Sequence, residues 1–224
     1  MSFDITQDTF VISDSHFGHK AVLKREPSRM QAAAANGYKD FYKFHRDKWN
    51  EVVGKKDNLL HLGDLYFVGG EAYLKSLKGS KALIVGNNDI KHFHKLKKWH
   101  IFKGLKLYIP QKEAILQALY KEFSKQTIKD DIYLNAIVQD IGTERIMFSH
   151  FPVFERKKYD RFATSRYMLD RLFILSDCSL NIHGHIHSRQ SRHSFCFNVS
   201  CEHLGFTPKR LSEILRLYRY RAQI

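Results

Sequence analysis

The stretch that decides the fold of this chain reads Phe10-Val11-Ile12-Ser13-Asp14-Ser15-His16-Phe17-Gly18-His19. Its first three residues form a short apolar run, which predicts a buried strand. Asp14 and His16 follow directly, where the chain leaves that strand. This spacing lets a carboxylate oxygen and an imidazole nitrogen turn toward one point, and such mixed donors suit a divalent metal ion. An Asp-x-His pair alone is more typical of an ordinary turn with an exposed histidine, so the interpretation depends on the rest of the chain.

Four further apolar runs end in polar clusters in the same way. They are Asn58–Leu62 before Gly63-Asp64, Ala82–Val85 before Gly86-Asn87-Asn88-Asp89, Ile146–Phe148 before Ser149-His150, and Leu180–Ile182 before His183-Gly184-His185-Ile186-His187. Strands that alternate with helices and end in polar residues are typical of an α/β protein with its site at the strand ends. We therefore expect the polar residues of all five clusters to lie close together.

Helical periodicity accounts for much of the sequence between these runs. Helices are expected at Ala21–Lys24, Tyr38–Val53, Ala72–Leu77, Glu113–Phe123 and Ser165–Leu175, with a closing helix after Pro208. Two more strands are expected at Ile132–Val138 and Phe195–Val199. Pro27 is expected to limit the first helix. His45, on the second helix, is interpreted as a packed or solvated residue and not as a metal ligand.

Composition predicts one folded, intracellular domain that spans residues 1–224. The chain has 224 residues, of which 43% are hydrophobic, and this is enough for one sizeable core. Three cysteines without a Cys-x-x-Cys pattern argue against a disulfide framework and favour a reducing cytosol. No secretory signal is visible, and no apolar run approaches the roughly 20 residues that span a bilayer. A cytoplasmic protein without a membrane partner is therefore expected.

The net charge of +14 favours a polyanionic partner or substrate. Two segments concentrate this charge, Ile90–Lys112, which has no acidic residue, and Glu155–Arg171. The first directly follows a polar strand end, so we expect it to form a basic wall that faces the substrate. The alternative is an ordinary solvated face. Composition does not indicate an oligomeric state.

The order of the five clusters resembles the calcineurin-like metallophosphoesterase family, whose pattern is Asp-x-His, Gly-Asp, Gly-Asn-His-Asp/Glu, a lone His, and Gly-His-x-His. The resemblance spans about Val11 to His187 and touches every block. The Ser-Asp-x-His-Phe-Gly-His start is similar to small bacterial and viral members. The resemblance implies an α/β fold, a four-layer α-β-β-α sandwich with two mixed sheets and the site at the strand ends.

The resemblance also implies two divalent metal ions. By position, the first metal would be held by Asp14, His16 and His187, the second by Asn87, His150 and His185, and Asp64 would bridge them. Two such ions can share a hydroxide that attacks a phosphoryl group and can stabilise the charge that builds on it. Oxygen and imidazole ligands without thiolates favour manganese, with iron, nickel and zinc as alternatives.

One departure from the family pattern concerns the catalytic residues. Asn88 stands where the family has a histidine that helps the leaving group depart, and an amide cannot give up a proton near neutral pH. In the family, the acidic residue at the position of Asp89 orients that histidine, and in this chain Asp89 has no histidine there to orient. Three outcomes are open: His19 or His92 replaces the missing acid, the substrate has a leaving group that departs easily, or turnover is slow. His19 is also a candidate phosphate contact, with a structural role in the turn as the alternative. Catalytic roles are thus assigned to Asn88, Asp89 and His19.

The resemblance and this departure favour a phosphodiesterase or nuclease that acts on a nucleotide or nucleic-acid phosphodiester. Two alternatives remain open. One is a phosphomonoesterase for small molecules or protein phosphate. The other is a nucleic-acid-binding protein with a decayed site, against which stands the presence of all seven expected ligands.

Overall fold

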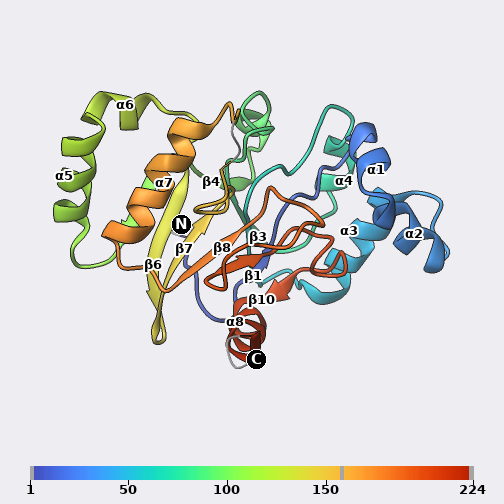
Figure 1. The fold of residues 1–224 in the computed structure, drawn as a ribbon. Coiled ribbons are helices and arrows are strands. Elements are labelled where there is room, and N and C mark those ends of the chain that lie inside the picture. Colours follow the sequence, from blue (N-terminus) through green and yellow to red (C-terminus); the bar gives the residue numbers. More distant parts are fainter. Residues whose placement is uncertain (1–2, 157–158, 222–224) are drawn as a thin grey trace.

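The computed structural model describes residues 3–156 and 159–221 and contains two five-stranded mixed sheets flanked by helices (Figure 1). The first sheet has the spatial order β10 (Lys209–Arg210), β1 (Phe10–Ile12), β2 (Asn58–His61), β3 (Ser80–Ile84) and β4 (Trp99–Phe102). The second has the order β5 (Leu105–Tyr108), β6 (Ala136–Ile141), β7 (Glu144–Ser149), β8 (Leu180–His183) and β9 (Cys196–Asn198). The predicted α/β fold with two mixed sheets is confirmed.

The strand directions bring the polar clusters to the same sheet edges. β1, β2 and β3 are parallel to one another, and β7 is parallel to β8. Only two pairs are antiparallel in the described sheets, β10 with β1 and β6 with β7. Because the carboxyl ends of parallel strands meet at one edge, each sheet presents its own set of polar residues there.

The two sheets share a hydrophobic core. Side chains alternate between the faces of a strand, and the second sheet shows this clearly. Ile137 and Phe148 pack into the cluster that the two sheets share, whereas Val138 and Met147 pack into a second cluster on the outer face. Both faces of this sheet are therefore covered, one by the other sheet and one by helices.

Helices enclose the sheets from both sides. They are α1 (Lys20–Arg25), α2 (Pro27–Ala35), α3 (Phe41–Val52), α4 (Glu71–Leu74), the short 3₁₀ helix η1 (Phe93–Lys95), α5 (Lys112–Glu122), α6 (Lys125–Asp130), α7 (Ala163–Leu175) and α8 (Leu211–Arg221). Figure 1 shows α5 to α7 on one side and α1 to α4 on the other. Trp49 of α3 packs into the shared core, and Leu169 of α7 packs into the outer cluster. No helix among these is long and apolar enough to cross a membrane.

Several elements differ from the predictions. β4, β5, α6 and β10 were not predicted, and the strand predicted from Ile132 begins at Ala136. The strand begins later in the chain for a local reason. The Asn135 side chain accepts a hydrogen bond from the Gly104 amide and donates one to the Val85 carbonyl. Pro27 begins α2, at a position where its missing N–H needs no partner.

The three cysteines are free thiols, in agreement with the expectation that they form no disulfide framework. Cys196 is buried in the outer cluster, and Cys178 packs against it. Cys201 is buried in the shared core.

His45 is fully buried on α3 and joins three segments, as a packed residue would. Its Nδ1 lies 2.8 Å from the Phe206 carbonyl oxygen, and its Nε2 lies 2.9 Å from Ser15 Oγ. Burial lowers its pKa to about 4. The folded state therefore holds this imidazole neutral at a pH at which an unfolded chain has already protonated it.

We expect this histidine to weaken the fold in acid. Between about pH 6.5 and pH 4 the unfolded state binds the proton and the folded state does not, so stability falls as pH falls. The loss should reach about 3 kcal/mol. Urea unfolding from pH 7.5 to pH 4.5 should show a shallower pH dependence for His45→Gln. A matched His94→Gln change at an exposed position is the control, and equal slopes in wild type and His45→Gln would contradict the expectation.

Candidate metal centre

Seven polar side chains that follow five strands meet in one region. The first sheet contributes Asp14 and His16 after β1, Asp64 after β2 and Asn87 after β3, and the second contributes His150 after β7 and His185 with His187 after β8. A cavity of about 310 Å³ opens over them, and five of the seven line it. Asp14 and His150 are buried. The site therefore lies where the edges of the two sheets meet.

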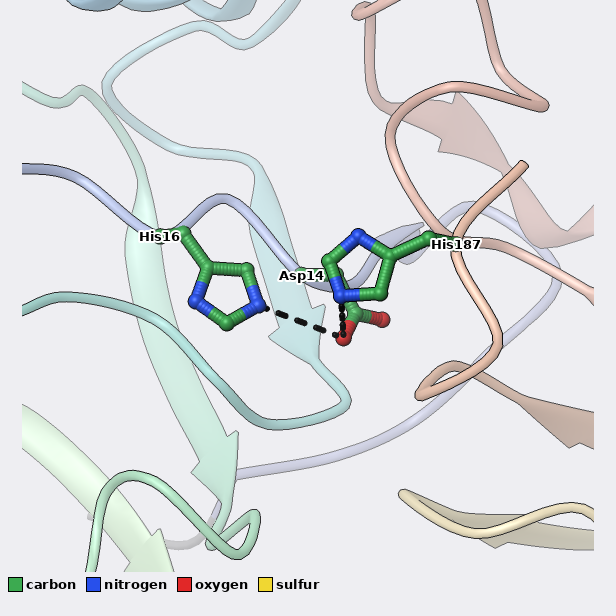
Figure 2. A group of neighbouring side chains, drawn as sticks. All are labelled: Asp14, His16 and His187. Carbon is green, nitrogen blue, oxygen red and sulfur yellow. Dashed lines mark ion pairs between the residues drawn. The ribbon is translucent and has the colours of Figure 1, made fainter. Parts of the chain in front are cut away.

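Asp14 is the centre of the first group. Its Oδ1 lies 3.7 Å from His16 Nε2 and 3.7 Å from His187 Nε2, and Figure 2 shows both imidazoles directed at this carboxylate. Asp14 Oδ1 and His16 Nε2 are buried and have no hydrogen-bond partner within the described residues. Because buried polar atoms without partners are costly, these atoms fit a cation that would contact both.

Asp64 connects the first group to the second. Its Oδ2 lies 3.5 Å from His16 Nε2, and its Oδ1 lies 3.6 Å from His150 Nε2. His150 Nε2 lies 3.0 Å from Asn87 Oδ1 and 3.3 Å from His185 Nδ1. All seven predicted ligands are thus linked by short distances. Three groups of donors in the described chain could each hold an ion: Asp14 with His16 and His187, Asp14 with Asp64 and His150, and Glu26 with His187 and Glu202.

Five of these residues adopt a backbone conformation that is uncommon for non-glycine residues. The φ angles are 57° at Asp14, 49° at His16, 56° at Asp64, 71° at His185 and 52° at His187. Such left-handed conformations cost on the order of 1–3 kcal/mol each and cluster at functional sites. The concentration of strain at these positions supports a functional role for the cluster.

Glycines make the close approach of these loops possible. A Cβ atom at Gly184 would collide with Ser13 Oγ and Asp14 Oδ2. At Gly63, where φ is 98°, a Cβ would lie 2.7 Å from His150 Nδ1. The side chains of the site occupy the space that any larger residue would need.

The protonation states of three ligands suit cation binding, whereas burial would lower the pKa of His187 but the hydrogen bond with Glu202 outweighs it and raises that pKa. Burial alone would raise the pKa of Asp14, but the contact with His16 and the charge on His187 hold it well below its usual value. Burial lowers the pKa of His16, and burial together with His150 lowers that of His185. Ionised carboxylates and neutral imidazoles are the forms that bind metal ions.

Arg29 and Glu202 support the site from behind, and neither was predicted from the sequence. Glu202 Oε1 accepts hydrogen bonds from Arg29 Nε at 2.8 Å and Nη2 at 2.6 Å, and it lies 3.1 Å from His187 Nδ1. A proton on His187 Nδ1 leaves Nε2 free to face Asp14. Burial raises the pKa of Glu202, but His187 and Arg29 outweigh it and lower the pKa to about 2.

Asn88 and Asp89 both contact the Asp64 loop. The Asn88 backbone N–H donates to Asp64 Oδ1 at 2.8 Å, and its side-chain amide donates to Asp64 Oδ2 at 2.5 Å. The carboxylate of Asp89 is fully buried and accepts hydrogen bonds from the backbone N–H groups of Asp64, Leu65 and Gly86. Burial and then the charge of Asp64 raise the pKa of Asp89 to about 7. Asn88 lines the cavity, whereas Asp89 positions the backbone beneath it.

His19 lies in the cavity beside the predicted ligands. Its Nδ1 is 3.3 Å from His16 Nδ1, and its ring stacks on Phe67 with centroids 3.7 Å apart. Burial and then His16 lower its pKa to about 4. His92, the alternative, contacts the rings of Tyr66 and Phe67 and is not among the described residues that line the cavity. The geometry favours His19 of the two.

The two basic segments differ in their relation to the site. Lys95, Lys97 and Lys98 line a separate pocket of about 510 Å³, which shares none of its described lining residues with the cavity. These lysines do not line the cavity over the ligands, and the expectation of a substrate-facing wall stays a prediction. In the second segment Arg161 does line the cavity. Lys157 and Lys158 lie outside the described residues.

Comparisons with known proteins bear on the fold. No family model matches the sequence, and no curated protein matches it significantly. A crystal structure of a protein of unknown function from Aquifex aeolicus aligns with a TM-score of 0.64 at 23% identity, over 93% of this chain and 98% of that one. A conserved uncharacterized protein from Streptococcus pneumoniae TIGR4, described as a predicted phosphoesterase, aligns with a TM-score of 0.34 at 13% identity, over 86% of this chain and 70% of that one. The first shows a shared fold, and the second is too weak to carry an argument.

The buried pair of Arg29 and Glu202 generates a prediction about stability. Glu202→Gln leaves the Arg29 charge without its partner, and Arg29→Met does the same to Glu202, so each should lower the free energy of unfolding by about 3–5 kcal/mol. The double variant should lose at least about 1 kcal/mol less than the sum of the single losses. Urea unfolding of the four proteins measures this coupling.

The half-buried surface pair of Lys209 and Glu213 is the matched control, because its charged atoms also lie 2.6 Å apart. Its coupling energy should stay below about 0.5 kcal/mol, as for surface pairs. Equal coupling energies for the two pairs would show that burial of Arg29 and Glu202 contributes nothing.

Proposed function

We propose that this protein is a phosphoesterase that depends on divalent metal ions, most plausibly a phosphodiesterase. The observation that carries the proposal is the convergence of seven oxygen and nitrogen donors in one region, five of them lining one cavity, with buried Asp14 Oδ1 and His16 Nε2 lacking hydrogen-bond partners within the described chain. The motif resemblance to calcineurin-like metallophosphoesterases supports it, and so does the pair of mixed sheets.

The ligand assignment follows the predicted sets. Asp14, His16 and His187 would hold one ion, and Asn87, His150 and His185 the other. Asp64 would serve both, since its two oxygens face His16 and His150. Two divalent ions, when bound, would supply the positive charge that activates a water molecule and stabilises a phosphoryl transition state. Manganese is favoured, with iron, nickel and zinc as alternatives.

The residues of the chain itself bind and orient the substrate. Asn88 lines the cavity and offers an amide that can donate a hydrogen bond but no proton. His19 lies beside it, stacked on Phe67, in a position to contact a phosphate. A site without a leaving-group acid at position 88 favours esters whose leaving group departs easily. The resemblance implies that family members without this histidine can still hydrolyse diesters, and this favours a phosphodiester over a phosphomonoester.

The first test of the proposal is the number of ions per chain. Protein loaded with manganese, desalted and analysed for metal should contain close to two ions. Asp64→Ala should lose most of both, because its carboxylate lies between the two groups of ligands.

Asp140→Ala is the control, since this exposed carboxylate pairs with Arg145 away from the site. It should retain both ions. One ion in the loaded wild-type protein, or normal metal content in Asp64→Ala, would contradict the dinuclear proposal.

The second test concerns Asn88. Asn88→His should raise kcat/KM about 10²-fold or more for an alkyl or ribose ester, whose leaving group needs a proton. It should raise the value only a few-fold for a nitrophenyl ester, whose leaving group departs unprotonated. Steady-state kinetics with a matched pair of diesters measures the difference.

His19→Ala tests the alternative donor in the same assay. If His19 supplies the proton, its loss should affect the alkyl ester more than the nitrophenyl ester, and Asn88→His should partly restore activity. Equal effects of both substitutions on both esters would make position 88 a matter of substrate fit, and the argument for diesters from Asn88 would fail.

A further inference from the structure

A second cavity continues the groove that begins at the metal centre. Its volume is about 210 Å³, and it shares Arg161, His185 and Arg189 with the cavity over the ligands. Its other lining residues are Glu155, Tyr159, Asp160, Phe162 and Arg166. The two cavities therefore form one groove that extends past His185 toward the start of α7.

Three arginines at the groove are left without carboxylate partners. Arg25, Arg161 and Arg189 are exposed, and none forms an ion pair within the described residues. The buried arginines nearby differ, because Arg29 pairs with Glu202 and Arg166 pairs with Asp160. A guanidinium offers a planar fork of donors that matches a phosphate.

The acidic residues of the groove offset part of this charge, and one of them, Asp64, is a proposed metal ligand. Asp160 is paired with Arg166, and Glu155 Oε1 accepts a hydrogen bond from the Arg192 backbone. Glu26 remains, at the end of the groove beside Arg25. The end formed by Arg161 and Arg189 is therefore the more positive of the two.

The arginines come from opposite sides of the molecule. Arg25 ends α1 and Arg161 precedes α7, and Figure 1 places these helices on opposite sides of the sheets. Both residues nevertheless line the same cavity. Positive charge thus flanks the metal ligands on both sides, an arrangement that suits a substrate with phosphates on both sides of the bond to be cleaved.

Aromatic side chains accompany the arginines. Tyr159 lines the second cavity with 90% of its surface exposed, whereas Phe162 is buried and its ring centre lies 4.5 Å from the Arg161 guanidinium. Cationic grooves with exposed aromatic rings bind single strands, because unpaired bases stack on such rings. A duplex keeps its bases paired and does not offer them.

We propose that this groove binds single-stranded nucleic acid, with Arg161 and Arg189 holding phosphates that flank the one at the metal centre. This inference rests on the proposed phosphodiesterase function and specifies its substrate class. The lysine pocket that contains Lys97 and Lys98 is separate from the groove and takes no part.

The test measures binding directly. A fluorescein-labelled thymidine strand of about 12 nucleotides, within the range of known site sizes, is made with phosphorothioate linkages that resist cleavage. Its affinity for the manganese-loaded protein is followed by anisotropy over a range of salt concentrations. Arg161→Gln/Arg189→Gln should weaken binding by at least about tenfold. It should also flatten the slope of log K against log salt by about 1.4, since each phosphate contact on a single strand contributes about 0.7.

Lys97→Gln/Lys98→Gln is the matched control, because it removes the same charge from the separate pocket. It should change affinity less than about threefold, as expected for charges outside the contact surface. An unchanged affinity and salt slope in the arginine variant would overturn the inference. A larger loss in the lysine variant, or tighter binding of a duplex of the same length, would also overturn it.

Hydrolysis of bis(4-nitrophenyl) phosphate separates this inference from the proposed function. If the loaded wild-type protein fails to hydrolyse this small diester and every other phosphoester, the proposed function fails, while the binding data still report on the groove. If kcat/KM for the small diester falls in the arginine variant as much as strand affinity does, the arginines serve the cleaved phosphate alone, and the inference is overturned.

Discussion

The site depends on the ion pair and the hydrogen bonds that the buried guanidinium of Arg29 forms. This guanidinium binds the Glu202 carboxylate and donates to the backbone carbonyls of Asp14 and Ser15, while Glu202 in turn contacts His187. These bonds join the loop after β1 to the loops after β8 and β9, which belong to different sheets. A charge this deeply buried must be fully compensated. The geometry of the candidate ligands is thus set by a helix, α2, that contributes none of them.

The sequence predicted the strands that carry the site for a physical reason. Buried strands such as β1 and β3 read as short apolar runs, and a polar cluster at the end of each marks the edge of the sheet. Parallel pairing of these strands is then sufficient to bring residues such as Asp14 and Asp64 close together. Strand order and register bring the expected ligands of each sheet to one edge.

Other features depend on tertiary contacts and could not be predicted in this way. β4 and β5 alternate exposed His100 and Lys106 with buried or half-buried residues, and the charge of that segment concealed the alternation. Arg29 lies in an alanine-rich helix with no local sign that it is buried. Glu202 did carry a signal, because it follows a strand end as the other site residues do. Packing decides which basic residues face the cavity. Among the described residues of the two basic segments, only Arg161 lines it.

The division of the ligands between the sheets has a consequence for the whole molecule. Asp14, Asp64 and Asn87 follow strands of one sheet, and His150 and His185 follow strands of the other. Ions held between them would therefore link the two sheets. Such ions stabilise the folded state by mass action, since no preformed site exists in an unfolded chain. The stability of the packing between the two sheets would then depend on the metal concentration around the protein. A chelator would remove this contribution and leave the hydrophobic core that the two sheets share.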